Sequence, residues 1–191
     1  MIRSYGTDPV DSSAVERILA NALHAPSAGF TQGWGFLLLD TPHDVQRFWA
    51  ACTPDEDGAA PDSWLRGMRT APVVIVPCSN ESAYRARYAE PDKQGPAPTE
   101  HVWPVPFWHM DTAMASLLML LTAVDEGLGA CFFGVPAARV ASFRSEFGVP
   151  EEYTPVGAIT LGHRTDEPGP RGSAARRRRR PVEEVVHRAA W

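Results

Sequence analysis

The stretch Ala25–Phe36, which reads APSAGFTQGWGF, concentrates small, polar and glycine residues between two apolar segments. Ser27, Thr31 and Gln32 supply hydrogen-bonding groups, and the glycines let the backbone approach another surface because no Cβ stands in the way. Pro26 removes a backbone donor and ends the helix before it. These residues would suit a ligand-binding loop. An ordinary helix-to-strand turn carries the same residue types for local backbone reasons, so the stretch alone leaves both interpretations open.

Two further segments carry side chains suited to binding. Arg176–Arg180 is a run of five arginines, which either binds a phosphate group or forms a solvated linker. Residues 101–111 read HVWPVPFWHMD, and their aromatic rings form either a wall for a flat ligand or a packed core patch. The rings in question are those of Trp103, Phe107 and Trp108. His109 and Asp111 would suit acid–base chemistry, but we interpret Asp111 as the cap of the helix that follows.

Hydrophobic periodicity predicts the elements that must position these residues. We expect helices over Asp11–Ala25, about Asp44–Cys52, Trp64–Met68, Asp111–Glu126 and about Ala137–Phe147. We expect strands over Phe36–Leu39, Ala71–Cys78, Ala130–Val135 and Val156–Leu161. The polar, proline-broken range Asn80–Thr99 is expected to form a lid or flap. This order predicts one α+β (α/β sandwich) domain over residues 1–191, with helices covering a small mixed sheet.

The predicted helix Asp111–Glu126 is apolar around most of its circumference. A helix of that kind is buried deep in a core or lies in a subunit interface. We therefore expect it to be the central helix of the fold.

Composition excludes several classes of protein. A chain of 191 residues with 44% hydrophobic and 21% charged residues is typical of a globular domain, and a net charge of −5 argues against general nucleic-acid binding. No window reaches the roughly 18 apolar residues that a membrane span needs, and the N-terminus has no apolar signal core. Three cysteines, Cys52, Cys78 and Cys131, have no metal-binding spacing, and their odd number favours a reducing, cytoplasmic location. We expect Cys131 to be a small buried residue rather than a nucleophile.

Four separated segments resemble the nitroreductase family of flavin enzymes, in the family's order. RSYGTDPV at Arg3–Val10 is similar to its opening R-x-Y/F-x-x-x-P-V, and Ala25–Phe36 to its loop A-P-S-A-x-N-x-Q-P-W-x-F. DEGLGACFFG at Asp125–Gly134 resembles the segment after its central helix. ITLGH and RRRPVEEVVH resemble its last strand and basic tail.

The resemblance implies a homodimer whose long central helices pack together and whose interface builds two sites for flavin mononucleotide (FMN). It implies that FMN takes hydride from NADH or NADPH and passes electrons to a small, often aromatic acceptor such as a nitro compound or quinone. A basic tail over about residues 164–191 would reach over the partner subunit.

The resemblance also assigns roles to residues. Arg177, Arg179 and Arg3 would hold the FMN phosphate. The backbone at Phe133 and Gly134 would reach flavin N5, and Arg66 would face the pyrimidine end. The partner's loop would lie along the ribityl chain and dimethylbenzene edge through Pro26, Ser27, Ala28 and Gln32. Trp103, Phe107 and Trp108 would stack on nicotinamide and acceptor. No residue is assigned a catalytic side chain, and no metal is implied.

Two departures from the family pattern leave alternatives open. The family carries an Arg and a Ser before the position of Arg3, so either further residues precede Met1 or phosphate binding relies on the tail. Phe30 and Gly33 replace the usual Asn and Pro, which removes one hydrogen bond to flavin and leaves a deazaflavin possible. The alternative functions are a pathway-specific flavin dehydrogenase or oxidase, and a non-catalytic or degenerate flavin-binding protein.

Overall fold

An antiparallel sheet of five strands forms the middle of the molecule. The computed structural model describes residues 1–53, 62–94, 103–165 and 176–191. The strands follow the order β1-β2-β5-β3, and β4 also pairs with β2. Their bounds are Trp34–Leu39 (β1), Val73–Asn80 (β2), Gly129–Phe133 (β3), Tyr153–Pro155 (β4) and Ala158–Gly162 (β5). Every strand pair in these residues is antiparallel, so the expected mixed sheet is in fact antiparallel.

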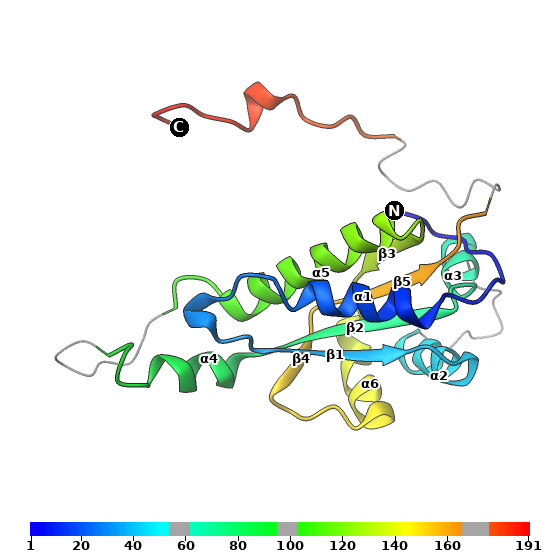
Figure 1. The fold of residues 1–191 in the computed structure, drawn as a ribbon, viewed down its shortest axis with the longest axis horizontal. Helices are drawn as coiled ribbons and strands as arrows, with labels where there is room; N and C mark the ends of the chain where they lie inside the picture. Colours follow the sequence, from blue (N-terminus) through cyan, green and yellow to red (C-terminus); the bar gives the residue numbers. More distant parts are fainter. Residues whose placement is uncertain (54–61, 95–102, 166–175) are drawn as a thin grey trace.

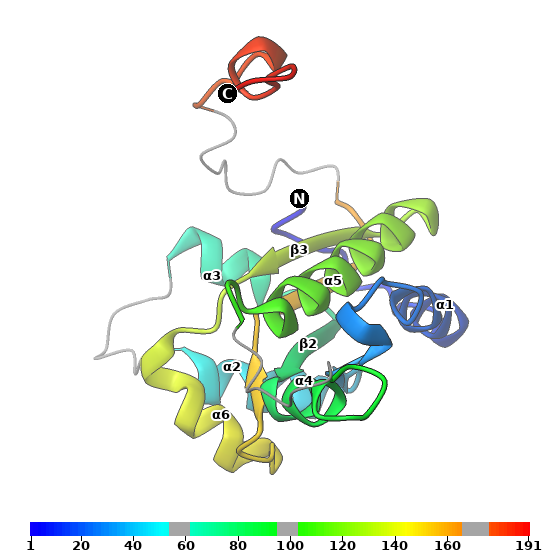
Figure 2. The same cartoon turned by 90° about the vertical axis from the view of Figure 1, so that its left-hand side faces the viewer.

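Helices cover both faces of this sheet (Figures 1 and 2). One face packs against α1 (Ser12–Ala22) and α5 (Phe107–Asp125), and the other against α2 (Pro42–Cys52), α3 (Ser63–Met68) and α6 (Val140–Phe147). The sequence of β2 is continuously apolar because each side of the strand faces a hydrophobic core. Val73 and Ile75 join the first core, whereas Val74 and Val76 alternate into the second.

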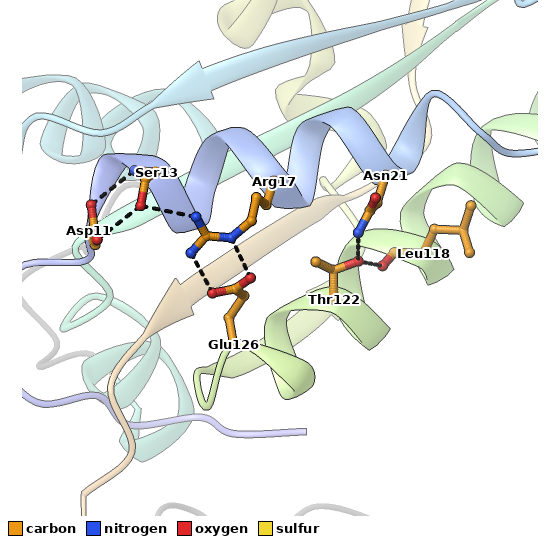
Figure 3. Close-up of polar contacts among 7 residues, drawn as sticks. All are labelled: Asp11, Ser13, Arg17, Asn21, Leu118, Thr122 and Glu126. Carbon is orange, nitrogen blue, oxygen red and sulfur yellow. Dashed lines mark hydrogen bonds and ion pairs between the residues drawn. The ribbon is translucent and has the colours of Figure 1, made fainter.

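Helices α1 and α5 lie side by side and are joined by polar contacts on their surface (Figure 3). The guanidinium of Arg17 donates to both carboxylate oxygens of Glu126, at 2.6 and 2.7 Å. Four residues further along α1, the Asn21 side-chain amide donates to the Thr122 hydroxyl at 3.2 Å. These bonds fix the position of α5 along α1.

Helix α5 has two contrasting faces. Its buried residues include Thr112, Ala115, Ser116, Met119 and Ala123, which pack toward the sheet and α1. Its opposite face leaves five apolar side chains between 37% and 57% exposed, and we call them the α5 apolar face: Met110, Met114, Leu117, Leu121 and Val124. The all-round apolar pattern thus combines a core face with an uncovered one. By length and composition alone this helix could cross a membrane, contrary to the sequence-based expectation, but the core helix of a globular domain meets the same test.

Most predicted elements are confirmed with shifts of a few residues at their ends, but two elements were missed and one predicted helix cap is wrong. The range expected to be a lid begins with a helix, α4 (Glu81–Tyr88), which Asn80 caps by accepting from the amide of Ala83 at 3.0 Å. Strand β4 was not predicted. Asp111 does not cap α5, because that helix begins at Phe107 and its N-cap is Pro106. The predicted features at 54–61, 95–102 and 166–175 lie outside the described residues.

Candidate functional site

The loop between α1 and β1 has a tightly folded backbone. A short 3₁₀ turn covers Ala28–Phe30, and the hydroxyl of Ser27 accepts from the backbone amide of Gln32 at 3.0 Å. Gly29, Phe30 and Gln32 have φ values of 62°, 54° and 52°, in the left-handed region that non-glycine residues rarely adopt. Such a backbone persists only where its surroundings hold it, and functional sites often contain one.

Aromatic rings of α4 explain two glycines of this loop. A Cβ on Gly29 would lie 2.8 Å from Cε2 of Tyr88, and a Cβ on Gly33 would lie 2.5 Å from Cε2 of Tyr84. The sequence-based expectation that these glycines allow a close approach is therefore met, and the approaching groups are side chains of the same chain. Gly33, which replaces the family's usual proline, makes room for the ring of Tyr84.

Asp111 connects α5 to both the loop and α4. Its Oδ2 accepts from the backbone amide of Ala28 at 2.8 Å and from the hydroxyl of Tyr84 at 2.7 Å, and the residue is only 2% exposed. Burial, followed by the bond to the Asp111 carboxylate, raises the pKa of Tyr84, so this hydroxyl keeps its proton. Asp111 thus holds the loop against the start of α5, the place where we had expected a helix cap.

The aromatic segment before α5 packs against the same side of α4. The ring of Trp103 contacts Tyr88 and Tyr84, with centroids 4.6 and 6.1 Å apart, and also meets Phe107 and Trp108 at 5.8 and 5.9 Å. Trp108 is buried, whereas Trp103 and Phe107 are half-buried. The structure therefore brings the predicted aromatic wall together with the loop, through the two tyrosines of α4.

His109 lies beside this group but points to the sheet. Its Nδ1 is 2.8 Å from the hydroxyl of Ser79, a fully enclosed residue near the end of β2. Burial lowers the pKa of His109, which favours the neutral imidazole near pH 7. The pair holds the first turn of α5 on the sheet.

A second group of predicted residues gathers at the end of β3. The ring of Phe133 stacks on Trp49 with centroids 5.6 Å apart and meets Trp64 edge-on at 5.6 Å. These three rings and Gly134 line a cavity of about 190 Å³. A Cβ on Gly134 would have no neighbour within 4 Å, so its backbone faces open space. Arg66 is exposed on α3, whose residues Trp64 and Leu65 line the same cavity.

The N-terminal segment runs along the opposite end of β3. The amide of Ile2 donates to the carbonyl of Ala130 at 2.9 Å, and the Tyr5 hydroxyl lies 2.7 Å from that of Thr160. Arg3 follows Ile2 directly, so its backbone lies beside β3. Burial raises the pKa of the Cys131 thiol, and the positive charge of Arg3 acts against that rise. Cys131 is buried, as predicted.

The predicted site residues thus fall into separate groups within one chain. The loop and the aromatic segment gather at the N-terminal end of α5, whereas Arg3, Phe133 and Gly134 lie along β3, which follows the C-terminal end of α5. Arg177 and Arg179 are exposed in the tail, which contains a short 3₁₀ turn at Val182–Glu184. In the described residues no group of histidine, cysteine or carboxylate side chains is arranged to hold a metal ion.

Sequence reasoning missed the role of Tyr84, and it misassigned Asp111. Asp111 and Ala28 are 83 positions apart, and Asp111 and Tyr84 are 27 apart, so no local pattern relates them. The available signal was an acidic residue in the first half of a mostly apolar helix, which indicates a buried partner.

This arrangement, a small antiparallel sheet between helix layers with one long, half-uncovered helix, occurs in known oxidoreductases. An FMN-dependent nitroreductase from Clostridium difficile superposes with a TM-score of 0.69 at 20% identity, covering 100% of this chain and 94% of that one. A nitroreductase family protein from Streptococcus pneumoniae superposes with a TM-score of 0.70 at 16% identity, covering 98% and 94%. The fold is therefore that of the nitroreductases.

Sequence comparison leads to the same family. The model of the nitroreductase family matches residues 1–163, and the chain belongs to that family. A Methanothermobacter thermautotrophicus protein, provisionally named NADH dehydrogenase/NAD(P)H nitroreductase, is 27% identical over 175 residues, which are 89% of this chain and 75% of that protein. Membership of this family makes the protein a nitroreductase-like oxidoreductase.

Proposed function

We propose that the protein is a homodimeric, FMN-dependent oxidoreductase that passes electrons from reduced nicotinamide to a small aromatic acceptor of the nitro or quinone type. The names of two similar proteins support the cofactor and the electron donor. The Clostridium difficile protein is named an FMN-dependent nitroreductase, and the name of the Methanothermobacter protein includes NAD(P)H nitroreductase. The observation that carries the proposal is the α5 apolar face, together with one group of predicted residues at the N-terminal end of α5 and a second group along β3, the strand that follows α5.

The α5 apolar face is a contiguous stripe, because its members recur at intervals of four and three residues. A stripe of this kind supports a symmetric contact with a second copy, in which the same residues meet on both subunits. When two α5 helices pack antiparallel, the N-terminal end of each lies toward the C-terminal end of the other. The loop of one subunit then approaches β3 of its partner.

This pairing would complete a flavin site that one chain leaves divided. Gly134 fits such a site, since its backbone faces open space that a Cβ would otherwise fill. On the loop, Pro26 and Gln32 are exposed and Ser27 and Ala28 are half-buried, so the exposed residues face outward from the subunit that carries them. The Ser27 hydroxyl accepts one bond internally and keeps its own hydrogen to donate.

When bound, FMN supplies the redox chemistry, taking a hydride equivalent from the nicotinamide and passing electrons to the acceptor. The chain's own residues then bind and orient. Backbone amides at Phe133 and Gly134 would donate hydrogen bonds where charge develops, and Arg66 would offset negative charge at the other end of the ring system. The half-buried rings of Trp103 and Phe107 would offer flat apolar contact to an aromatic acceptor, and the buried Trp108 would support the ring of Trp103.

A phosphate is bound by guanidinium groups or by backbone amides, and the tail and the N-terminal segment offer guanidinium groups. Arg177 and Arg179 are exposed, and the tail around them also exposes Val182, Val185 and Val186 at 68%, 48% and 51%. An arm with both basic and apolar groups suits docking on a partner subunit that also holds the cofactor.

The test is to purify the protein, add FMN and record the visible spectrum, then titrate anaerobically with NADPH and NADH. We expect a yellow protein that either nucleotide bleaches and that a nitroaromatic or quinone reoxidises. Protein that takes up no FMN would overturn the proposal. If the protein takes up a deazaflavin but not FMN, the proposed cofactor is wrong and a deazaflavin takes its place. Flavin that binds but is not bleached would indicate a binding protein rather than this enzyme.

A further inference from the structure

A buried carboxylate at the start of α5 holds the loop that is proposed to contact flavin. Asp111 accepts from Ala28 and Tyr84 through the same oxygen, Oδ2, at 2.8 and 2.7 Å. Burying a carboxylate is costly unless hydrogen bonds replace its contacts with water, and these two bonds provide that compensation. A group this enclosed, at 2% exposure, cannot itself reach a ligand at the surface.

The loop has further restraints on the same side. The guanidinium of Arg87 on α4 donates to the backbone carbonyl of Gly29 at 3.0 Å. The backbone amide of Asn80 donates to the backbone carbonyl of Gly33 at 2.8 Å. Together with Asp111, these groups bind three backbone positions of a loop whose φ values at Phe30 and Gln32 are unfavourable. Asp111 acts nearest to Ser27, since it holds the amide of the next residue.

The consequence for the binding groups follows from the short chain between them. Ser27 precedes the Ala28 amide, and its hydroxyl accepts from Gln32, so the two predicted flavin ligands form one unit with the backbone that Asp111 holds. Release of the Ala28 amide would let this unit move. The aromatic ring of Phe30, 77% exposed, is carried by the same turn.

We propose that Asp111, supported by Tyr84, is the positioning residue of the flavin-binding loop, setting Ser27 and Gln32 in place through the Ala28 amide. The inference rests on the proposed function for its ligand, FMN. Its structural part, the control of the loop by a buried carboxylate on α5, can be measured without any cofactor.

The experiment compares four variants: Asp111→Ala, Asp111→Asn, Tyr84→Phe and Ser116→Ala. Ser116→Ala is the matched control, because Ser116 is equally buried on α5 but donates only to the carbonyl of Thr112 within the helix. Asp111→Asn is the conservative variant, since its amide oxygen can occupy the place of Oδ2 and accept both bonds. Amide exchange over residues 27–33 is measured without flavin, and FMN affinity is measured by fluorescence titration.

We expect Asp111→Ala to speed exchange in the loop and to weaken FMN binding by about tenfold, as loss of the hydrogen bonds that order the binding groups would. Asp111→Asn should restore most of both values, Tyr84→Phe should fall between, and Ser116→Ala should match the wild type. Unchanged exchange in Asp111→Ala would show that the carboxylate does not hold the loop. Faster exchange with unchanged FMN affinity would overturn the link to flavin.

The two proposals fail in different ways. If the wild type binds no FMN, the proposed function fails, while the exchange rates still decide whether Asp111 controls the loop. If Asp111→Ala does not fold, Tyr84→Phe carries the test, because it removes one of the two donors and leaves the carboxylate in place. A Tyr84→Phe variant identical to the wild type in both measurements would then overturn the inference.

Discussion

Arg17 on α1 and Glu126 just beyond α5 form a two-pronged ion pair, with Nε to Oε1 at 2.6 Å and Nη2 to Oε2 at 2.7 Å (Figure 3). Planar guanidinium and carboxylate groups match in this geometry. The pair lies on the surface, so its effect on stability is modest and depends on salt. It nevertheless connects the first helix to the end of the helix that presents the α5 apolar face.

The ion pair predicts a pH dependence of stability. The bonds from Arg17 lower the pKa of Glu126, so this interaction contributes fully above the ordinary glutamate pKa of about 4.3 and is lost as the pH falls through the lowered value. We expect Arg17→Ala to melt below the wild type at pH 7, and the gap to narrow as the pH falls below the ordinary glutamate pKa. Melting temperatures across an acidic series test it, and a gap that does not narrow with falling pH would contradict the assignment.

A substitution at Gly134 is expected to weaken flavin binding without changing the stability of the fold. A Cβ there meets no atom within 4 Å, so Gly134→Ala should leave the melting temperature unchanged. If FMN occupies this space, the added methyl group should weaken its binding by about tenfold. The matched control is Gly157→Ala, whose Cβ would lie 2.5 Å from Cζ of Phe132 and should cost about 1–3 kcal/mol of stability. Unchanged FMN affinity in Gly134→Ala would remove this position from the site.

The α5 apolar face predicts the oligomeric state. Leu117 is 53% exposed at the middle of the stripe, and an aspartate there would bury a charge in the contact between two subunits. We expect Leu117→Asp to be monomeric by light scattering after gel filtration, and to lose FMN because the site needs both subunits. Leu23→Asp, at a leucine with 55% exposure outside α5, is the control and should remain dimeric. A dimeric Leu117→Asp protein would place the interface elsewhere.

Tyr5 predicts how firmly the N-terminal segment is held. Its ring is 3% exposed, and its hydroxyl lies 2.7 Å from that of Thr160 while donating to the carbonyl of Ile2 at 2.8 Å. Tyr5→Phe removes both bonds, although the Thr160 hydroxyl keeps its bond to the Cys131 carbonyl at 3.4 Å, and the loss should cost about 1–3 kcal/mol in urea unfolding. A loss well below this range would show that water replaces the hydroxyl. Because Arg3 is two residues away, FMN affinity should fall as well if Arg3 contacts the phosphate.

The sequence predicted those features that repeat locally. Helical periodicity located α1, α2 and α5, and the β-branched run located β2, because burial on one face or both leaves a regular apolar pattern. The same pattern could not divide α5 into a core face and an uncovered face, since both are apolar. Only the packed structure distinguishes Met119 at 0% exposure from Leu121 at 57%.

Long-range contacts limited prediction of the site. The motif made Ser27 and Gln32 candidates for flavin binding. The partner that holds their loop is Asp111 on a distant helix, and the glycines of the loop face tyrosines of α4. Helix α4 itself was missed because nearby prolines dominated the interpretation. Its local signals were an Asn80 cap and a Glu81–Arg85 pair one turn apart.

The arginine run offers a test in which position alone differs between variants. By resemblance, Arg177 and Arg179 face the FMN phosphate, whereas Arg176 and Arg178 alternate with them along the exposed tail. A double Arg177→Ala, Arg179→Ala variant should bind FMN at least about tenfold more weakly, as loss of guanidinium–phosphate bonds predicts. The double Arg176→Ala, Arg178→Ala variant removes the same total charge, so it controls for general electrostatic attraction. An equal loss of affinity in both variants would mean that the tail acts only through its net charge, and no loss in either would mean that it is a linker.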